Sequence, residues 1–329
     1  MNSKMNDKII ERISREAGID DLVETLATQL NPTDLQSLLI EVYRRRAEAL
    51  APRDLLDQYQ HNRFVQPAQA SPIAQLDFDR LAYALLPPGF EAIELSPVAP
   101  LGACSVVSSV SQNVVVPTIR NTEVCSDATN VLALECARRR RQILRGDPRA
   151  TDRIKLGTSH RLLRAQKFEG PASFQHFSIF TLCTAGRDEG SFKFETEALL
   201  EQLDFYVRLL DKAGELGYTI EDIRVSVTAL DEQRIDALQA TLRAGVVDPL
   251  AAKHPNVKVG FDQGRQSGRG YYANTCFQIR ARDRSGTDYL LVDGGFTTWT
   301  QQLLSNRKER LMTSGLGSER VCACFRTSE

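Results

Sequence analysis

Strand-like and helical segments alternate through the C-terminal part of this chain, and this alternation constrains the fold more than any other feature. From residue 153 onward, β-branched and aromatic runs with period-two spacing are separated by amphipathic stretches. The predicted strands are residues 173–183, 224–228, 275–281 and 289–292, and the predicted helices are residues 194–214, 232–244 and 298–310. Many strands lying close in sequence, mixed with helices, predict an α+β fold.

The N-terminal part of the chain predicts helices only. Apolar residues recur at helical spacing over residues 5–60, and Thr33 with a Gln three residues later has the pattern of a capping box that starts a helix. Residues 61–75 are rich in Pro, Ala and Gln, which is typical of a linker. We therefore expect an N-terminal helical region over residues 1–65 and a second domain over residues 66–329.

The segment between these parts predicts both kinds of element. A helix is expected over residues 76–86, and the strand-like runs that follow are residues 91–96, 105–110 and 114–119. Ser126 and Asp127 then predict the start of a long helix with acidic charge in its first turn. This helix carries four consecutive arginines, 138–141, which we expect to face solvent; contact with a dimer partner or an anion is the alternative.

Composition excludes several classes of protein. The net charge is −1, so no overall positive field favours sequence-independent binding of nucleic acid or of an anionic membrane. The seven cysteines are irregularly spaced and lack the paired motifs of a zinc site, which predicts buried or free thiols in a reducing compartment. The polar N-terminus and the absence of a long apolar run predict a cytoplasmic protein without a membrane span.

Four stretches are informative together because of their order along the chain. They are TIRNTEVCSDAT at 118–129, HRLLRAQKFEGPASFQHF at 160–177, RQSGRGYYANTCFQ at 265–278 with DGGF at 293–296, and GLGSER at 315–320. Singly, each has an ordinary structural interpretation: Asp127 suits a helix N-cap, and paired tyrosines beside glycines suit a strand. No glycine-rich strand–helix fingerprint of the Rossmann or Walker type is present.

In this order the four stretches resemble the catalytic core of class II aminoacyl-tRNA synthetases of the histidyl branch. The resemblance covers about residues 118–320. It implies an antiparallel β-sheet flanked by helices, preceded here by the N-terminal helical segment, and a homodimer built on residues 78–97. It also implies ATP and Mg²⁺ as cofactors and a reaction between ATP and a carboxylate that gives an acyl-adenylate.

The resemblance assigns the nucleotide site to two of the stretches. Arg161 would hold the α-phosphate and the reacting carboxylate, with Arg164 as the second choice, because a forked guanidinium suits both anions. Phe174 would stack on adenine, and Arg320 would lie over the opposite face of the base and reach the γ-phosphate. The remaining expected nucleotide-binding residues are Gly315, Gly317 and Glu319.

The other stretches would form the amino-acid pocket. Its expected residues are Asp127, Thr129, His176, Arg269, Tyr271, Tyr272, Gly294 and Gly295. A carboxylate at Asp127 suits an α-ammonium group. The chain departs from the family pattern in four places, at Cys125, Leu163, Phe180 and Ser267, and these departures argue against histidine as the ligand.

Two functions remain compatible with the sequence. The chain ends nine residues after Arg320, where the histidyl family continues with a tRNA-binding module, so ordinary tRNA charging is not expected. The first function is ATP-dependent activation of an amino acid or related small carboxylate for another acceptor. The alternative is a non-catalytic paralogue that binds a small ligand and regulates a partner protein, as the regulatory subunit of ATP phosphoribosyltransferase does. The residues do not identify a metal site.

Overall fold

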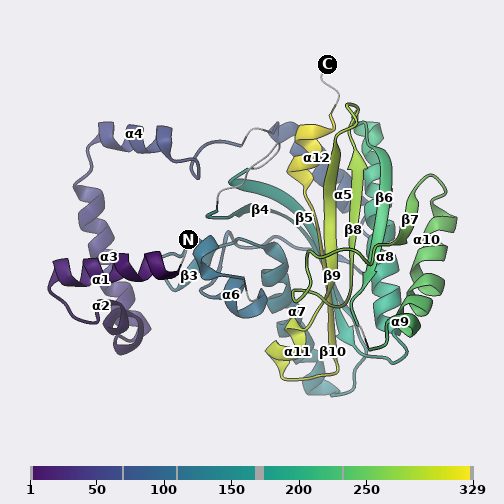
Figure 1. Cartoon of the computed structure of the whole chain (residues 1–329), viewed down its shortest axis with the longest axis horizontal. Helices are drawn as coiled ribbons and strands as arrows, with labels where there is room; N and C mark the ends of the chain where they lie inside the picture. Colours follow the sequence, from purple (N-terminus) through teal and green to yellow (C-terminus); the bar gives the residue numbers. More distant parts are fainter. Residues whose placement is uncertain (1–2, 69, 109, 167–173, 232, 327–329) are drawn as a thin grey trace. The chain divides into compact units, whose positions relative to one another are not determined.

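A computed structural model describes the chain except for residues 1–2, 69, 109, 167–173, 232 and 327–329 (Figure 1). The chain divides into two compact units. The first comprises Met1–Arg63 with Pro117–Thr122, and the second comprises Phe64–Val116 with Glu123–Glu329. Within the described residues, no helix is both long and apolar enough to cross a lipid bilayer.

The first unit is helical, as the sequence predicts. Its helices are α1 Ser3–Ala17, α2 Leu22–Glu24, η1 Thr25–Gln29, α3 Pro32–Glu48 and α4 Pro52–His61. The predicted capping box at Thr33 is wrong, because α3 begins earlier: the side chain of Asn31 accepts a hydrogen bond from the backbone N–H of Asp34 at 2.9 Å. No described residue of α2, η1, α3 or α4 is buried, so these helices contribute no core of their own.

The second unit is organised by one eight-stranded sheet in the order β1-β4-β5-β10-β9-β8-β6-β7. The strands are β1 Glu91–Ala92, β4 Ile154–Leu163, β5 His176–Arg187, β6 Glu221–Ala229, β7 Lys258–Phe261, β8 Ala273–Arg282, β9 Asp288–Thr297 and β10 Glu309–Leu316. The pairs β1/β4 and β6/β7 are parallel, and the pairs between them are antiparallel. The predicted α+β fold with an antiparallel sheet is therefore confirmed.

Helices flank this sheet on both faces. They are α5 Pro72–Ala84, α6 Ala103–Ser108, α7 Ala128–Gly146, α8 Lys193–Lys212, α9 Ile235–Leu242, α10 Asp248–Lys253, α11 Trp299–Leu304 and α12 Ser318–Cys324, with short turns η2 Gln112–Val114, η3 Ala213–Leu216 and η4 Arg243–Val247. A small second sheet joins β2 Val98–Pro100 to β3 Thr122–Val124.

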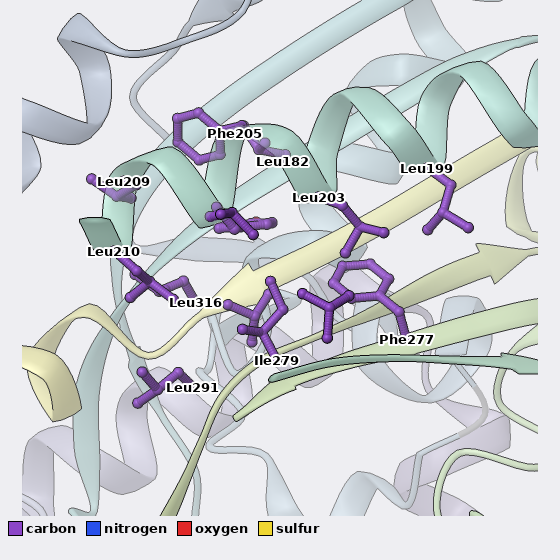
Figure 2. Packing of buried hydrophobic residues seen from close by; sticks show 14 of the residues in the cluster. Leu182, Leu199, Leu203, Phe205, Leu209, Leu210, Phe277, Ile279, Leu291 and Leu316 are labelled. Carbon is purple, nitrogen blue, oxygen red and sulfur yellow. The ribbon is translucent and has the colours of Figure 1, made fainter. Parts of the chain in front are cut away.

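The larger core lies between α8 and the sheet. Figure 2 shows Leu199 and Leu203 of α8 above Phe277 and Ile279 of β8, in a cluster whose buried members are almost fully excluded from solvent. A smaller core joins α7 to the opposite face through Leu132, Cys136 and neighbouring side chains. Burial of a large apolar side chain contributes about 1.5–3 kcal/mol, so these two layers hold the sheet in place.

Several predicted elements differ from the structure. Residues 105–110 were expected to form a strand, but Ala103–Ser108 is α6: its buried residues recur at 103, 104, 107 and 108, which is a helical spacing that the valine-rich composition obscured. Residues 114–119 do not form a strand either. The helix expected over residues 298–310 ends at Leu304.

The strand β10 was not predicted. Leu311, Met312, Thr313 and Ser314 follow one another in its middle, and all of them are buried. A central strand covered on both faces lacks the alternation that identifies a half-exposed strand, so the sequence carried no period-two signal here.

The arginines 138–141 also divide into two kinds. Arg138 is exposed as predicted, but the prediction is wrong for Arg140, whose side chain is fully buried. Its Nε and Nη2 donate to the two carboxylate oxygens of Glu309 at 2.8 and 2.9 Å. Two backbone carbonyls, of Asp152 and Ala150, accept its remaining hydrogen bonds. Arg140 therefore joins α7 to β10 rather than facing solvent.

Candidate functional site

A cavity of about 320 Å³ opens on the sheet face that carries α7. Eight of the sequence-predicted site residues line it: Asp127, Thr129, Phe174, Tyr271, Tyr272, Gly315, Gly317 and Arg320. They come from the start of α7, the end of the loop before β5, the approach to β8, and the β10–α12 junction. The fold thus brings together residues that are almost 200 positions apart in the sequence.

Asp127 caps the helix that begins at the cavity, and it also lines the cavity. It is the N-cap of α7, where its Oδ1 accepts hydrogen bonds from the backbone N–H of Thr129 at 2.9 Å and from the Thr129 hydroxyl at 2.7 Å. Its Oδ2 meets the guanidinium of Arg164 at the longer distance of 3.4 Å. One oxygen therefore fixes the helix end, and the other can accept a hydrogen bond from a ligand in the cavity.

Arg164 lines the cavity, whereas Arg161 does not. Side chains alternate between the two faces of a strand. Leu162 of β4 packs with Cys125 and Ala128 on the α7 side, so Arg164, two residues on, follows Leu162 to that side. Arg164 donates from Nε to the carbonyl of Ser126 at 2.9 Å, and its guanidinium lies 5.3 Å from the ring centroid of Phe177.

Arg161 belongs instead to a cluster on the other side of β4. Its Nη1 lies 2.9 Å from Oε2 of Glu319, a fully buried carboxylate that also accepts the backbone N–H of Ser178 at 2.9 Å. The same Nη1 lies 2.9 Å from Nδ1 of His176. Nε2 of His176 lies 2.6 Å from the carbonyl of Gln66, so Nε2 carries the proton and Nδ1 accepts from Arg161. Arg161, His176 and Glu319 thus lie together, and none of them lines the cavity.

Arg320 is positioned by the first turn of α12. Its Nη1 donates to the carbonyl of Leu290 at 2.8 Å, which leaves the rest of the guanidinium at the cavity wall. The neighbouring Glu319 is held by Arg161 and by β5, so the cluster around Arg161 also fixes the start of the helix that carries Arg320.

The two tyrosines form one wall of the cavity. Their rings meet edge to face with centroids 4.9 Å apart, and Tyr271 also packs against Trp299 at 5.5 Å. Burial raises the pKa of both phenols above the usual range. Both hydroxyls therefore stay protonated at neutral pH and can donate hydrogen bonds.

Gly294 and Gly295 allow close packing on the two faces of β9, against the larger core and against this wall respectively. They are not among the residues that line the cavity. A Cβ at Gly294 would lie 2.5 Å from the ring of Phe277, and one at Gly295 would lie 2.7 Å from the ring of Tyr272. Glycine is therefore required where β9 passes between these two rings.

Asp293 lines the cavity, and the sequence did not single it out as a site residue. The side chain of Arg265, only 4% exposed, donates from Nη2 to both of its oxygens at 2.8 and 3.0 Å. Gln278 donates to the same carboxylate at 3.1 Å. An acidic residue before a Gly-Gly pair, directly after a predicted strand, was the available signal, but its buried arginine partner could not be identified without the fold.

Neither of the arginines that flank Ser267, Arg265 and Arg269, is among the described residues that line the cavity. Arg265 is tied to Asp293 behind the wall, and its other hydrogen bonds go to backbone carbonyls. Arg269 donates to the carbonyl of Arg265 at 3.0 Å, and it is not among the residues that line the cavity. Burial raises the pKa of Cys125, another departure from the family pattern, to about 12, so this position holds a neutral thiol.

No protein-family model matches the chain, and no curated protein matches it. Solved structures do. An ATP phosphoribosyltransferase regulatory subunit/histidyl-tRNA synthetase from Bacillus halodurans C superposes with a TM-score of 0.56 at 14% identity, covering 80% of this chain and 83% of that one. Apo histidyl-tRNA synthetase from S. aureus gives 0.55 at 14%, covering 78% and 67%. The chain has a class II synthetase-like core.

In a third solved structure, the match covers almost the whole of the other chain. A histidine–tRNA ligase subunit from Alicyclobacillus acidocaldarius gives a TM-score of 0.53 at 13% identity, covering 78% of this chain and 94% of that one. Identities this low establish the fold alone. The class II synthetase-like core predicted from four short stretches is thus confirmed, and the chemistry has to be argued from the residues of this chain.

Proposed function

We propose that this protein activates an amino acid, or a related small carboxylate, by reaction with ATP outside ordinary tRNA charging. A carboxylate oxygen of the substrate attacks the α-phosphorus, a new C–O–P linkage forms, and the bond from the α-phosphorus to the β-phosphate oxygen breaks. The products are an acyl-adenylate and pyrophosphate. The observation that carries the proposal is one cavity lined by Phe174, Arg320, Arg164 and Asp127.

The nucleotide half of the cavity suits ATP. An aromatic ring at Phe174 offers a stacking surface for a base, and the guanidinium of Arg320 offers a planar cation for the base or a phosphate. Gly315 and Gly317 also line the cavity, and because neither has a side chain, a nucleotide can approach the backbone closely there. These are the roles that the resemblance implies for the same four residues.

The carboxylate half supplies charge rather than a nucleophile. Arg164 can neutralise charge on the α-phosphate and on the incoming carboxylate, which is the role predicted for Arg161. Oδ2 of Asp127 can bind an α-ammonium group. Among the described residues there is no group of three or more potential metal ligands, so Mg²⁺ would arrive on the phosphates and partly neutralise them.

A second function is supported by one observation, the missing arginine. With Ser267 at that position and Arg265 committed to Asp293, the cavity could bind ATP or an amino acid without rapid turnover. The protein would then be a ligand-binding regulator of a partner protein, and one of its structural neighbours is named as the regulatory subunit of a phosphoribosyltransferase. A homodimer is proposed for either function.

Pyrophosphate–ATP exchange distinguishes the two. Purified full-length protein with ATP, Mg²⁺ and labelled pyrophosphate is screened over amino acids and small carboxylates, while calorimetry measures the binding of ATP alone. If the protein activates a carboxylate, pyrophosphate–ATP exchange should occur only in the presence of one carboxylate or a few related ones. ATP or amino-acid binding without exchange for any carboxylate would favour the regulator, and the absence of ATP binding would overturn the nucleotide site.

A further inference from the structure

A second hollow of about 230 Å³ adjoins the cavity. The two share three residues, Asp127, Arg164 and Tyr271, which therefore form the boundary between them. Beyond this boundary the second hollow is lined by Cys104, Ser108, Val110, Val114, Ser126 and Gln166. The proposed activation of a carboxylate uses none of these six residues.

The shared boundary indicates what enters the second hollow. The carboxylate of an activated amino acid has to lie in the main cavity, where the α-phosphate is. If its ammonium group binds Oδ2 of Asp127, the third substituent of its Cα starts from the boundary itself. We infer that the second hollow receives the side chain of the substrate amino acid, and that this side chain is uncharged. The inference depends on the proposed binding of an amino acid in the cavity.

The lining explains why the side chain is uncharged. Apart from Asp127 and Arg164 at the boundary, the described lining residues carry hydroxyl, thiol, amide and apolar groups only. An ionised side chain placed beyond the boundary would lose hydration and would gain no counter-ion from these described groups, which costs several kcal/mol. Val110 and Val114 offer apolar contact, and Ser126 and Gln166 offer hydrogen-bonding groups.

One side of the hollow is held in place by a buried carboxylate. Glu123, which is 1% exposed, accepts the backbone N–H of Cys104 at 2.8 Å and that of Gly102 at 2.8 Å. It also accepts Nε2 of Gln112 at 2.7 Å. One buried carboxylate thus ties α6 to η2, the two segments whose residues form the far wall.

Ser108 adds a second tie. Its hydroxyl donates to the carbonyl of Cys104 at 2.6 Å and accepts from Nδ2 of Asn130 on α7 at 3.3 Å. Glu123, Ser108 and Asn130 are therefore positioning residues that fix the size of the hollow, and the lining valines determine what it accepts.

The test compares amino acids with neutral and ionised side chains in exchange and in calorimetric binding. For the best neutral amino acid we expect kcat/KM to be about 100-fold higher, or Kd about 100-fold lower, than for lysine, arginine, aspartate and glutamate. A preference for any of these four ionised amino acids would overturn the inference and leave the proposed activation intact.

Two variants test the placement. Val114→Asp puts a carboxylate in the hollow. It should raise the kcat/KM for lysine relative to that for valine by about 10-fold or more. Val114→Phe fills the hollow and should weaken every amino acid by about 10-fold while ATP binding stays unchanged. The matched control is Val106→Asp on α6, where the valine is 74% exposed and does not line the hollow.

The outcomes separate the inference from the function on which it rests. If neutral amino acids bind but support no pyrophosphate exchange, the proposed activation is wrong and the inference about the hollow stands. If Val114→Asp leaves the selectivity unchanged and Val114→Phe leaves the affinity for amino acids unchanged, the inference about the hollow is overturned and the proposed activation stands. Absence of binding by every amino acid would overturn the inference even if ATP binds.

Discussion

At the scale of single residues, the face of β4 decides which arginine lines the cavity. Arg161 and Arg164 are three positions apart, so they project to opposite faces of an extended segment. We predict that Arg164→Ala lowers kcat/KM for pyrophosphate exchange by about 100-fold or more, since it removes a charged donor from the reacting groups. Arg161→Ala should keep the Kd for ATP within about threefold and lower Tm instead, because Glu319 loses a partner in a buried site.

Arg80→Ala is the matched control for both variants. This arginine is 80% exposed and pairs with Asp77 on its own helix, so exchange and Tm should both stay near wild type. Loss of exchange in Arg161→Ala at unchanged Tm would show that the sequence-based choice of Arg161 was the right one. The sequence alone could not decide, since both arginines fit the motif and only the pairing of β4 with β5 gives the register.

At the scale of elements, the buried pair Arg140–Glu309 fastens α7 to β10. Removing one partner leaves an uncompensated charge in the core, which costs about 3–5 kcal/mol. We predict a loss of that size in the free energy of unfolding for Arg140→Met, measured by denaturant titration. The double variant Arg140→Met/Glu309→Leu should recover part of it, since apolar side chains can replace a buried ion pair.

Arg138→Met is the control for this pair, on the same helix and in the same run of arginines. Arg138 is 63% exposed and should contribute less than about 1 kcal/mol. Equal effects at the two positions would contradict the buried role of Arg140. A run of four like residues carries no period in the sequence, so only the packed structure distinguishes the inward arginine from its neighbours.

The elements that the sequence predicted best are those with one exposed face. The strand β6 and the helix α8 alternate between core and solvent, and both were found close to their predicted limits. The strand β10 is covered on both faces and has no period-two signal. The helix α6 has only 6 residues and is valine-rich, which hides the helical spacing of its buried residues. Likewise, Asp127 and Arg320 could be predicted as site residues from local motifs, whereas Arg265 and Asp293 became partners only through the sheet.

At the scale of the whole molecule, the hydrophobic core belongs to the second unit alone. Every buried residue of the three apolar clusters lies at or beyond Ala74, and α2, α3 and α4 bury none of their described residues. Helices of this length are marginal without tertiary packing. We therefore expect the first 63 residues to contribute little to the stability of the core.

This predicts that a chain starting at Phe64 folds cooperatively. Its Tm should lie within about 4 °C of full length, because a loss of about 1 kcal/mol corresponds to about 2–4 °C in a domain of this size. A matched truncation starting at Leu86 removes α5, with the fully buried Phe78 and Ala82, and should lose its cooperative transition. Thermal unfolding followed by circular dichroism measures both. A drop of more than about 10 °C for the first truncation would show that the N-terminal helices stabilise the core, since it exceeds what about 2 kcal/mol can account for.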